Sequence, residues 1–250
     1  CMQPSEIDAE LTATNPWWRS PENWEQQDVQ LREARKAPFE YEPAPLHDLT
    51  PGGLYILRGP RRVGKSTALK QLVRRRLEEG QNPRMILYAS VEGRGASDLA
   101  DLVRRGADHW LAAAPGERLW MLDEVTGVKG PWPAQVKRLR DTHPSFADDT
   151  VVLTGSSATQ FDEAQKMLGG RRRAERSDRV LLQMPFVEWV RARGLDDLPP
   201  SPGFTPEELA DADRLDPAIE KIRPWMPDLI EHYDDYLQVG GYPQAVSAHL

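Results

Sequence analysis

Short apolar runs alternate with segments of helical spacing along the chain from residue 54 onward. Five runs are typical of strands buried on both faces of a sheet: Leu54–Leu57, Met85–Val91, Leu119–Leu122, Val151–Leu153 and Val180–Met184. Helical spacing of apolar residues between and after these runs predicts helices over Lys65–Glu79, Asp98–Ala114, Ala134–Asp141, Ser157–Leu168 and Phe186–Arg193. This order predicts an α/β fold with a parallel five-stranded sheet, helices on both faces, and ligands beyond the carboxyl ends of the strands.

The pattern divides the chain into three segments. Residues 1–46 are rich in proline, with one helix expected near residues 26–36, and they predict an N-terminal strap. Its Trp17, Trp18 and Trp24 are expected to dock on the next segment, because aromatic residues are rare in disordered chain. Residues 47–193 form the predicted core, and residues 194–250 read as a proline- and glycine-rich linker followed by a small helical region.

Charge is distributed unevenly over the 250 residues, whose formal net charge is -7. The stretch from Arg58 to Arg76 has eight basic and no acidic residues, whereas residues 196–235 have twelve acidic and three basic ones. A polyanion is therefore expected to meet the first stretch and not the second. The sequence has neither an apolar run of membrane-spanning length nor a secretory signal pattern, which favours a cytoplasmic protein without a membrane partner. Its single cysteine, Cys1, can form neither an internal disulfide nor a zinc site.

A glycine-rich loop follows the first predicted strand and opens a predicted helix. It has the pattern G-x4-G-K-[ST] of a phosphate-binding loop (P-loop, Walker A), and the binding residues expected are Gly59, Pro60, Arg61, Arg62, Val63, Gly64, Lys65, Ser66 and Thr67. Backbone N–H groups of such a loop and the positive end of the helix face an anion. Lys65 is expected to bind the β- and γ-phosphate oxygens, and Ser66 to bind Mg²⁺.

The third predicted strand ends in two carboxylates, Asp123 and Glu124, as a Walker B strand does. Neither residue helps a strand to pair, so both are candidates for chemistry. Asp123 is expected to hold Mg²⁺ directly or through water, and Glu124 to orient and deprotonate the attacking water. This arrangement is typical of the additional-strand, catalytic-glutamate division of P-loop NTPases. Because the guanine-reading pattern N-K-x-D does not occur, ATP is favoured over GTP, and the lack of L-S-G-G-Q disfavours an ABC transporter subunit.

Polar residues after the fourth strand and basic residues after the next helix are further candidates. Ser156, with Thr154 second, is expected to sense the γ-phosphate, although capping of the following helix explains a serine there equally well. Arg171 is a candidate arginine finger in the same subunit or, in a homo-oligomer, in a neighbouring one; the alternative is a solvated basic face. The basic triplets 74–76 and 171–173 also suggest a DNA-binding patch.

Taken together, the ordered motifs resemble a known family of proteins. The runs LYILRGPRRVGKSTALKQLV, LWMLDEVTGVKGPW, VVLTGSSA, LGGRRR, LLQMPFVEWV and YLQVGGYPQAV are similar to those of prokaryotic AAA-type ATPases that carry a DUF4143-like C-terminal region. The resemblance extends from about Asn15 to the end of the sequence. It implies an AAA-like core that binds ATP and Mg²⁺, with Lys65, Ser66 and the other residues above in the roles given, and an effector portion that continues past residue 250.

Two functions remain open from the sequence. The first is a Mg²⁺-dependent ATPase that couples hydrolysis to movement of the C-terminal region or of a partner. The second is an ATP-gated switch that hydrolyses slowly or not at all, because both need the same binding residues. Transfer of phosphate to a small acceptor is disfavoured by Glu124, which suits activation of water.

Overall fold

The computed structural model describes residues 3–112, 118–200 and 203–250, so Cys1 and the last residues of the helix predicted over 98–114 lie outside the described part. The chain forms two compact units, each with its own packing. The first comprises Cys1–Lys36 and Glu42–Leu182, and the second comprises Ala37–Tyr41 and Gln183–Leu250. No helix of the described residues is both long and apolar enough to cross a membrane.

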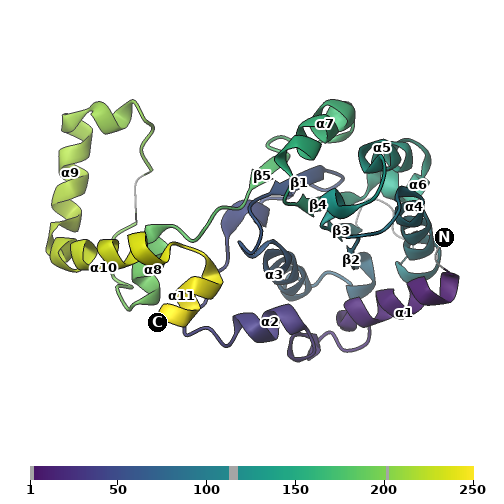
Figure 1. Cartoon of the computed structure of the whole chain (residues 1–250), viewed down its shortest axis with the longest axis horizontal. Helices are drawn as coiled ribbons and strands as arrows, with labels where there is room; N and C mark the ends of the chain where they lie inside the picture. The colour runs from purple at the N-terminus through teal and green to yellow at the C-terminus, as the bar shows by residue number, and fades with distance from the viewer. Residues whose placement is uncertain (1–2, 113–117, 201–202) are drawn as a thin grey trace. The chain divides into compact units, whose positions relative to one another are not determined.

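A five-stranded sheet forms the centre of the first unit (Figure 1). Its strands lie in the order β2-β3-β4-β1-β5, and every pairing is parallel: β1 (Leu54–Arg58), β2 (Ile86–Ser90), β3 (Leu119–Asp123), β4 (Thr150–Gly155) and β5 (Asp178–Val180). The predicted α/β fold with a parallel five-stranded sheet is thus confirmed. Strand β4 lies between β1 and β3, so the strand before the glycine-rich loop and the strand before the paired acids are separated by one strand.

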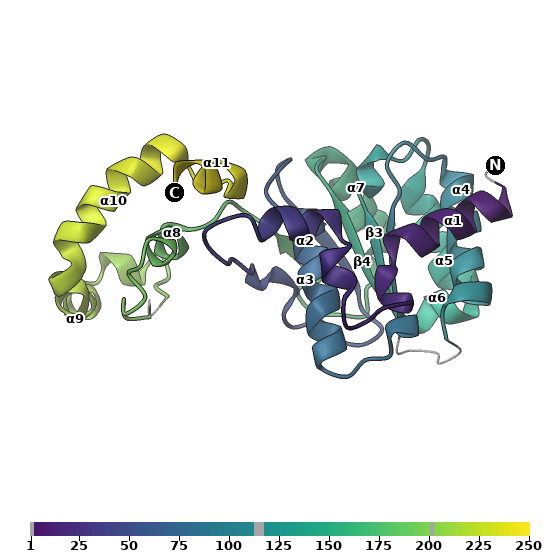
Figure 2. The ribbon, with the colours of Figure 1, turned by 90° about the horizontal axis from the view of Figure 1, so that it is seen from below.

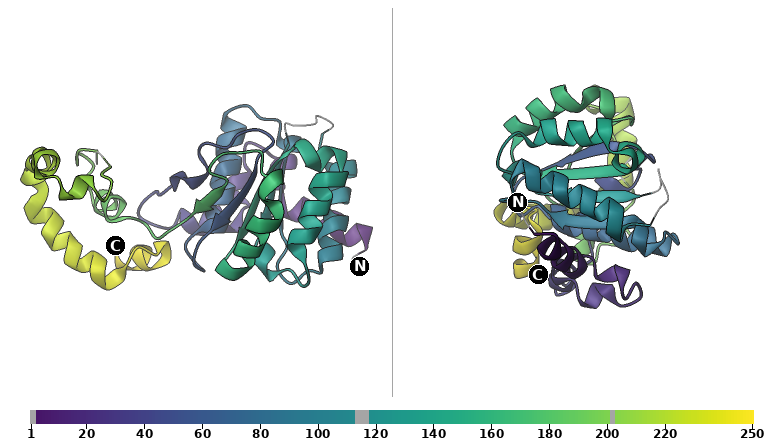
Figure 3. Two further views of the ribbon diagram at one scale, coloured as in Figure 1. Left: turned by 90° about the horizontal axis from the view of Figure 1, so that it is seen from above. Right: turned by 90° about the vertical axis from the view of Figure 1, so that its right-hand side faces the viewer.

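Helices cover both faces of this sheet, as Figures 1 and 3 show. Helix α3 (Lys65–Glu78) lies on one face, with α2 (Val29–Ala34) packed against it. The other face carries α4 (Ala96–Arg105), α5 (Trp132–Thr142) and α7 (Ala158–Leu168), and the short α6 (Pro144–Asp148) packs on α5. The crossover from β1 to β2 runs opposite to the later ones, which places α3 alone among the crossover helices on its face because parallel crossovers are right-handed.

The N-terminal segment packs on the α3 face and along the outer edge of β2 (Figure 2). Trp17, Trp18 and Trp24 are buried, as expected for anchors, and the indole N–H groups of Trp17 and Trp18 both donate to the carbonyl of Ile86, at 3.1 and 2.8 Å. Asn15 is fully buried and pairs with the backbone of Tyr88: its Oδ1 accepts from the N–H (2.7 Å) and its Nδ2 donates to the carbonyl (2.9 Å).

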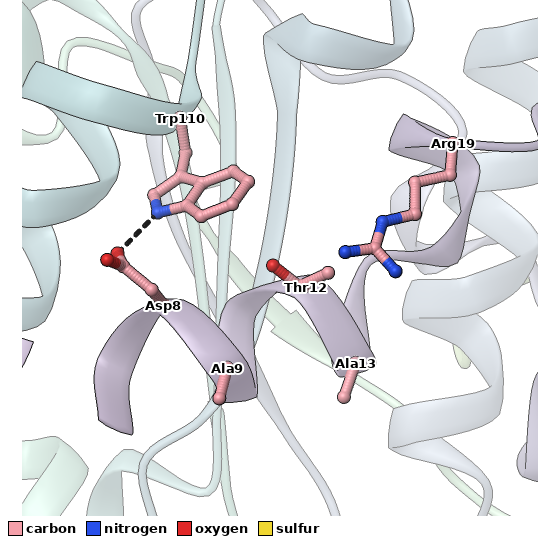
Figure 4. Close-up of a pocket in the computed structure, with 6 residues that line it drawn as sticks. All are labelled: Asp8, Ala9, Thr12, Ala13, Arg19 and Trp110. Atoms are coloured by element: carbon pink, nitrogen blue, oxygen red, sulfur yellow. Dashed lines mark hydrogen bonds between the residues drawn. The ribbon is translucent and has the colours of Figure 1, made fainter. Parts of the chain in front are cut away.

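Helix α1 (Pro4–Thr14) is held at the end of α4 by one carboxylate. Asp8 accepts hydrogen bonds from Arg105 (2.8 and 2.6 Å) and from Trp110 Nε1 (2.7 Å), and Trp18 stacks on Trp110 at 5.3 Å between ring centroids. An open pocket of about 400 Å³ lies beside this contact (Figure 4), and its lining residues are Asp8, Ala9, Thr12, Ala13, Arg19 and Trp110. The contact fixes α1 to the unit through groups 97 or more residues apart in sequence.

The second unit is helical and has a small core. It contains α8 (Phe186–Ala192), α9 (Ala212–Ile222), α10 (Met226–Val239) and α11 (Pro243–His249). Its buried residues are Met184, Trp189, Val190 and Val246, against which Phe39 and Tyr41 also pack. The division of the chain at residues 46 and 193 remains a prediction from composition. The compact units divide the chain after residue 182, and residues 37–41 belong to the second unit.

Several element boundaries differ from those predicted. The strand predicted over Val180–Met184 is Asp178–Val180, because pairing with β1 reaches only Arg58, although the N–H of Leu181 still donates to that residue's carbonyl. The long helix predicted from Asp98 ends at Arg105 and continues as a π-helical turn, Gly106–Trp110. The helix predicted near residues 26–36 is a 3-10 turn, Trp24–Gln26, followed by α2. Helices α1 and α6 were not predicted.

Candidate active site

The glycine-rich loop connects the carboxyl end of β1 to the N-terminus of α3. Gly59 passes close to neighbouring backbone, since a Cβ at this position would lie 2.3 Å from the carbonyl oxygen of Leu181. Gly64 has φ of +100° and caps α3, a left-handed conformation that favours glycine. Val63 is buried beneath the loop, whereas Arg61 and Arg62 are exposed. The first N–H groups of α3 have no acceptor within the helix and are available to an anion.

Lys65 is the first residue of α3 and is almost fully buried, at 4% exposure. Its Nζ donates to the carbonyls of Gly59 (3.1 Å) and Pro60 (2.9 Å), so the side chain folds back over the loop that precedes it. The same Nζ lies 3.5 Å from Oε1 of Glu124. The Lys65 ammonium is therefore positioned between the glycine-rich loop and Glu124.

Asp123 ends β3 and is the centre of a buried group of hydroxyls. Its Oδ2 accepts from Ser66 Oγ (2.6 Å) and from the Tyr88 hydroxyl (2.8 Å), and its Oδ1 accepts from Thr154 Oγ1. Only 2% of Asp123 is exposed. The structure thus brings three residues to Asp123, from α3, β2 and β4, that are 31 to 57 positions from it in sequence.

Glu124 follows Asp123 in a conformation that is unusual for a side-chain-bearing residue. Its φ of 57° and ψ of 46° are left-handed, and its N–H donates to Thr154 Oγ1 at 3.0 Å. Such backbone costs of order 1 kcal/mol or more and is common at functional sites. Here it turns the glutamate out of the strand direction, so that its carboxylate is partly exposed and faces Lys65.

The donor set at this site fits Mg²⁺. Ser66 Oγ and Asp123 Oδ2, 2.6 Å apart, are hard oxygen donors from two elements. Magnesium takes few protein ligands and completes its shell with phosphate oxygens and water. Among the described residues no group of three or more His, Cys, Asp or Glu side chains could hold a metal ion, so a cation here would depend on this pair together with phosphate and water.

Comparison with known proteins identifies the family of the chain. The sequence matches the family described as AAA domain over residues 52–189, which is more than half of its length. The chain belongs to the AAA domain family. Membership in this family supports nucleotide binding and hydrolysis as the general class of function. The AAA domain match includes the glycine-rich loop, Asp123 and Glu124.

Solved structures with a similar backbone share little sequence with this AAA domain. They include Cdc6p from Pyrobaculum aerophilum (13% identity, TM-score 0.40, covering 71% of this chain and 50% of that one). The ORC1 protein of Aeropyrum pernix in complex with DNA has 16% identity and a TM-score of 0.40 over 72% of this chain and 52% of that one. The Hsp104:casein complex of S. cerevisiae has 13% identity and a TM-score of 0.40 over 70% and 31%. This chain therefore spans about half the length, or less, of these structures. No curated protein matches the sequence.

The two polar candidates near the end of β4, Thr154 within the strand and Ser156 after it, occupy different positions in the AAA domain. Thr154 is fully buried and is one of the residues whose hydroxyls donate to Asp123. Ser156 is half-buried, and its N–H donates to Thr126 Oγ1 at 3.2 Å. Ser157 is the residue before α7, and its side chain makes no capping hydrogen bond in the described part of the chain, so the capping explanation loses its support for Ser157.

Arg171 lies away from this site. It follows α7 in a 3-10 turn, Gly169–Arg171, and donates two hydrogen bonds to Asp141, at 2.6 and 2.9 Å. The next residue, Arg172, accepts through its carbonyl from Leu54 N–H, at the amino end of β1, whereas the phosphate loop is at the carboxyl end. The structure therefore does not bring Arg171 to the phosphate loop of its own chain.

The remaining residues of the two basic triplets are also ion-paired. Arg74 and Arg75 both bind Glu42, and Arg76 binds Glu79 at 3.2 Å. Arg172 binds Asp178, and Arg173 binds Asp148, each at 2.5 Å. Local acids thus offset much of the positive charge that the sequence offered to a polyanion.

Sequence reasoning missed two buried residues that support Asp123, namely Tyr88 and Lys70. Tyr88 reads as an ordinary core residue of an apolar strand, and Lys70 as one base among many. Burial shifts both groups: it raises the pKa of Tyr88, with Asp123 adding to the effect, and it lowers the pKa of Lys70 to about 8 against the opposing influence of Asp28. A lysine on the apolar face of a predicted helix was the one available signal for this group.

Proposed function

We propose that this AAA domain binds ATP with Mg²⁺ at the phosphate loop and hydrolyses it. One observation carries the proposal: Ser66, at the start of α3, donates a hydrogen bond to Asp123, at the end of β3. This contact places the two expected metal ligands side by side, and Lys65 and Glu124 lie 3.5 Å apart beside them. Phosphate, metal and water could then meet within one small region.

Each residue has a part that follows from its position. The N–H groups at the start of α3 and the Lys65 ammonium bind the phosphate oxygens, and Ser66 and Asp123 hold Mg²⁺. Magnesium held by these two residues would supply partial neutralisation of the phosphate charge. Glu124 accepts a proton from the attacking water. Thr154 fixes the backbone of Glu124 through the 3.0 Å hydrogen bond, which leaves Ser156 as the first candidate for contact with the γ-phosphate.

The contact between Lys65 and Glu124 favours a second candidate, the slow ATP-gated switch. While the two charges lie 3.5 Å apart, the lysine is bound to loop carbonyls and the glutamate to the lysine. Hydrolysis requires Lys65 to exchange these carbonyls for phosphate oxygens and Glu124 to turn to water. A domain in which this exchange is rare would bind ATP and turn over slowly.

Coupling to a partner belongs to the same proposal. The second unit is a candidate for movement driven by hydrolysis, and Arg171 is a candidate for action in the site of a neighbouring subunit, because it cannot reach the loop of its own chain. DNA binding finds less support, since the arginines of both triplets have acidic partners.

Phosphate release and ATP binding together test the proposal. The parent protein should bind ATP in calorimetry and release phosphate, and Glu124→Gln should keep binding while release falls at least about 100-fold. ATP binding without release in either protein would favour the switch. A parent protein that is folded and binds no ATP would refute both candidates.

A further inference from the structure

Tyr88 has a buried hydroxyl to which the proposed function gives no role. The side chain belongs to β2 and is 4% exposed, and phenylalanine would fill the same space. A buried hydroxyl requires a partner, because an unsatisfied one costs about 1–3 kcal/mol. The Tyr88 hydroxyl donates to Asp123 Oδ2 at 2.8 Å, and it also shares a hydrogen bond with the Gln30 side chain. The tyrosine therefore contacts the carboxylate proposed to hold the metal.

The carboxylate of Asp123 is held at both oxygens by hydroxyl groups. Thr154 donates to Oδ1, and Ser66 and Tyr88 donate to Oδ2. Ser66 is itself an expected metal ligand, and it must turn its hydroxyl oxygen toward Mg²⁺ when the cation binds. The Tyr88 hydroxyl then remains as the hydrogen bond that fixes Oδ2 and keeps the carboxylate from rotating.

Tyr88 is in turn fixed by the N-terminal segment. Asn15 binds both its backbone N–H and its carbonyl, at 2.7 and 2.9 Å. The ammonium of Lys70 lies 3.7 Å from the centre of the tyrosine ring, on its face, where a cation is attracted. Lys70 is held there by Asp28 Oδ2 (3.2 Å) and by the carbonyl of Thr14 (3.1 Å). Asn15 thus holds the backbone of Tyr88, and Asp28 and Thr14 hold the lysine that lies over its ring.

We propose that Tyr88 is a positioning residue for the metal-binding carboxylate of Asp123, and that residues 14–28 of the N-terminal segment hold Tyr88 in place for this task. The inference rests on the proposed function, because it assigns Asp123 to magnesium. It explains why a lysine and an aspartate are buried together behind β2, where an apolar pair would cost less to bury. Partners of metal ligands typically change metal affinity 10- to 100-fold when they are removed.

Magnesium-dependent binding of a non-hydrolysable ATP analogue, AMP-PNP, tests this inference in the full chain. Calorimetry in EDTA gives the affinity without metal, and a series of magnesium concentrations gives the midpoint at which the affinity improves. For Tyr88→Phe we expect an unchanged affinity in EDTA and a magnesium midpoint raised about tenfold. Asn15→Ala, which acts from the N-terminal segment, should raise the midpoint in the same direction by a smaller factor.

Tyr55→Phe is the matched control. Tyr55 is a fully buried tyrosine of β1 whose hydroxyl accepts from Thr50 N–H at 2.6 Å and does not contact Asp123. This variant should leave the midpoint unchanged even if it lowers the melting temperature, which separates positioning from loss of stability. An unchanged midpoint in Tyr88→Phe, or an equal rise in Tyr55→Phe, would overturn the inference. Absence of any AMP-PNP binding by the folded parent would instead refute the proposed function.

Discussion

Replacement of Gly59 by alanine is the sharpest test of the loop geometry. A Cβ at this position would lie 2.3 Å from the Leu181 carbonyl oxygen and 3.2 Å from Val63 Cγ1. Carbon and oxygen normally approach to about 3.3 Å, so the loop or the segment after β5 must move by about 1 Å. Forced overpacking of this kind costs about 2 kcal/mol, which would lower the melting temperature by roughly 4–8 °C. We also expect a displacement of this size at a binding loop to weaken nucleotide binding about 100-fold.

Calorimetric titration of AMP-PNP and a thermal melt measure the two effects of Gly59→Ala. The matched control is Gly169→Ala, because Gly169 has an ordinary φ of -49° and a Cβ there has no neighbour within 4 Å among the described residues. The control should bind nucleotide as the parent does and melt at the same or a slightly higher temperature. If Gly59→Ala binds AMP-PNP with parental affinity, contact with Leu181 does not set the loop, and the reasoning fails.

Three further predictions concern other parts of the first unit. Arg140 donates to four backbone carbonyls at 2.7–3.3 Å. Arg140→Met should therefore lower the free energy of unfolding, measured in urea, by roughly 3 kcal/mol; a loss below about 1 kcal/mol would contradict this. Arg171→Ala should lower phosphate release on the order of 10³-fold if the arginine acts in a neighbouring subunit, and mixing with Glu124→Gln should restore part of the rate; no recovery would argue against action between subunits. Hydrogen bonds from Arg105 and an indole lower the pKa of Asp8 from 3.8 to about 2, so the carboxylate stabilises α1 above pH 3.8 and loses this effect as the pH falls toward 2. Asp8→Asn should remove this pH dependence, measured as hydrogen exchange of the α1 backbone, and the change should be under about 1 kcal/mol because the Asp8–Arg105 pair is partly exposed to water.

The sequence predicted those parts of the fold that depend on local pattern. Continuous apolar runs identified four of the five strands to within two residues at either end, because a strand buried on both faces carries that signal in its own residues. The end of the sheet was less predictable. Leu181 and Met184 are as apolar and buried as strand residues, yet β5 ends at Val180, since ladder pairing is decided by the partner strand.

Elements with a weak local signal were missed for a related reason. Helix α1 buries only Ile7 and Leu11, and its contact with α4 is made by Asp8, whose partner Arg105 is 97 residues away. The helix predicted from Asp98 changes to a π-helical turn at Gly106, where a Cβ would lie 2.7 Å from Leu87 and 3.0 Å from Trp120. Neither contact could be predicted from the local sequence.

The candidate site shows the same division between local motif and distant contact. Motif spacing was enough to propose the glycine-rich loop and the acid pair as candidates, since each motif lies within a few consecutive residues. The support behind Asp123 depends on Tyr88, which is 35 residues distant. A tyrosine in an apolar strand has no pattern that separates a packing role from a positioning one, and only the fold reveals which carboxylate its hydroxyl meets.

The docking of the N-terminal segment along β2 has a consequence for solubility. This strand is at the margin of the sheet, and the outward-facing peptide groups of Ile86 and Tyr88 are bound by side chains of Asn15, Trp17 and Trp18. An uncovered margin of this kind recruits strands from other molecules and promotes aggregation. Detachment of these three residues would leave a template for self-association, so the segment protects the folded chain from its own copies.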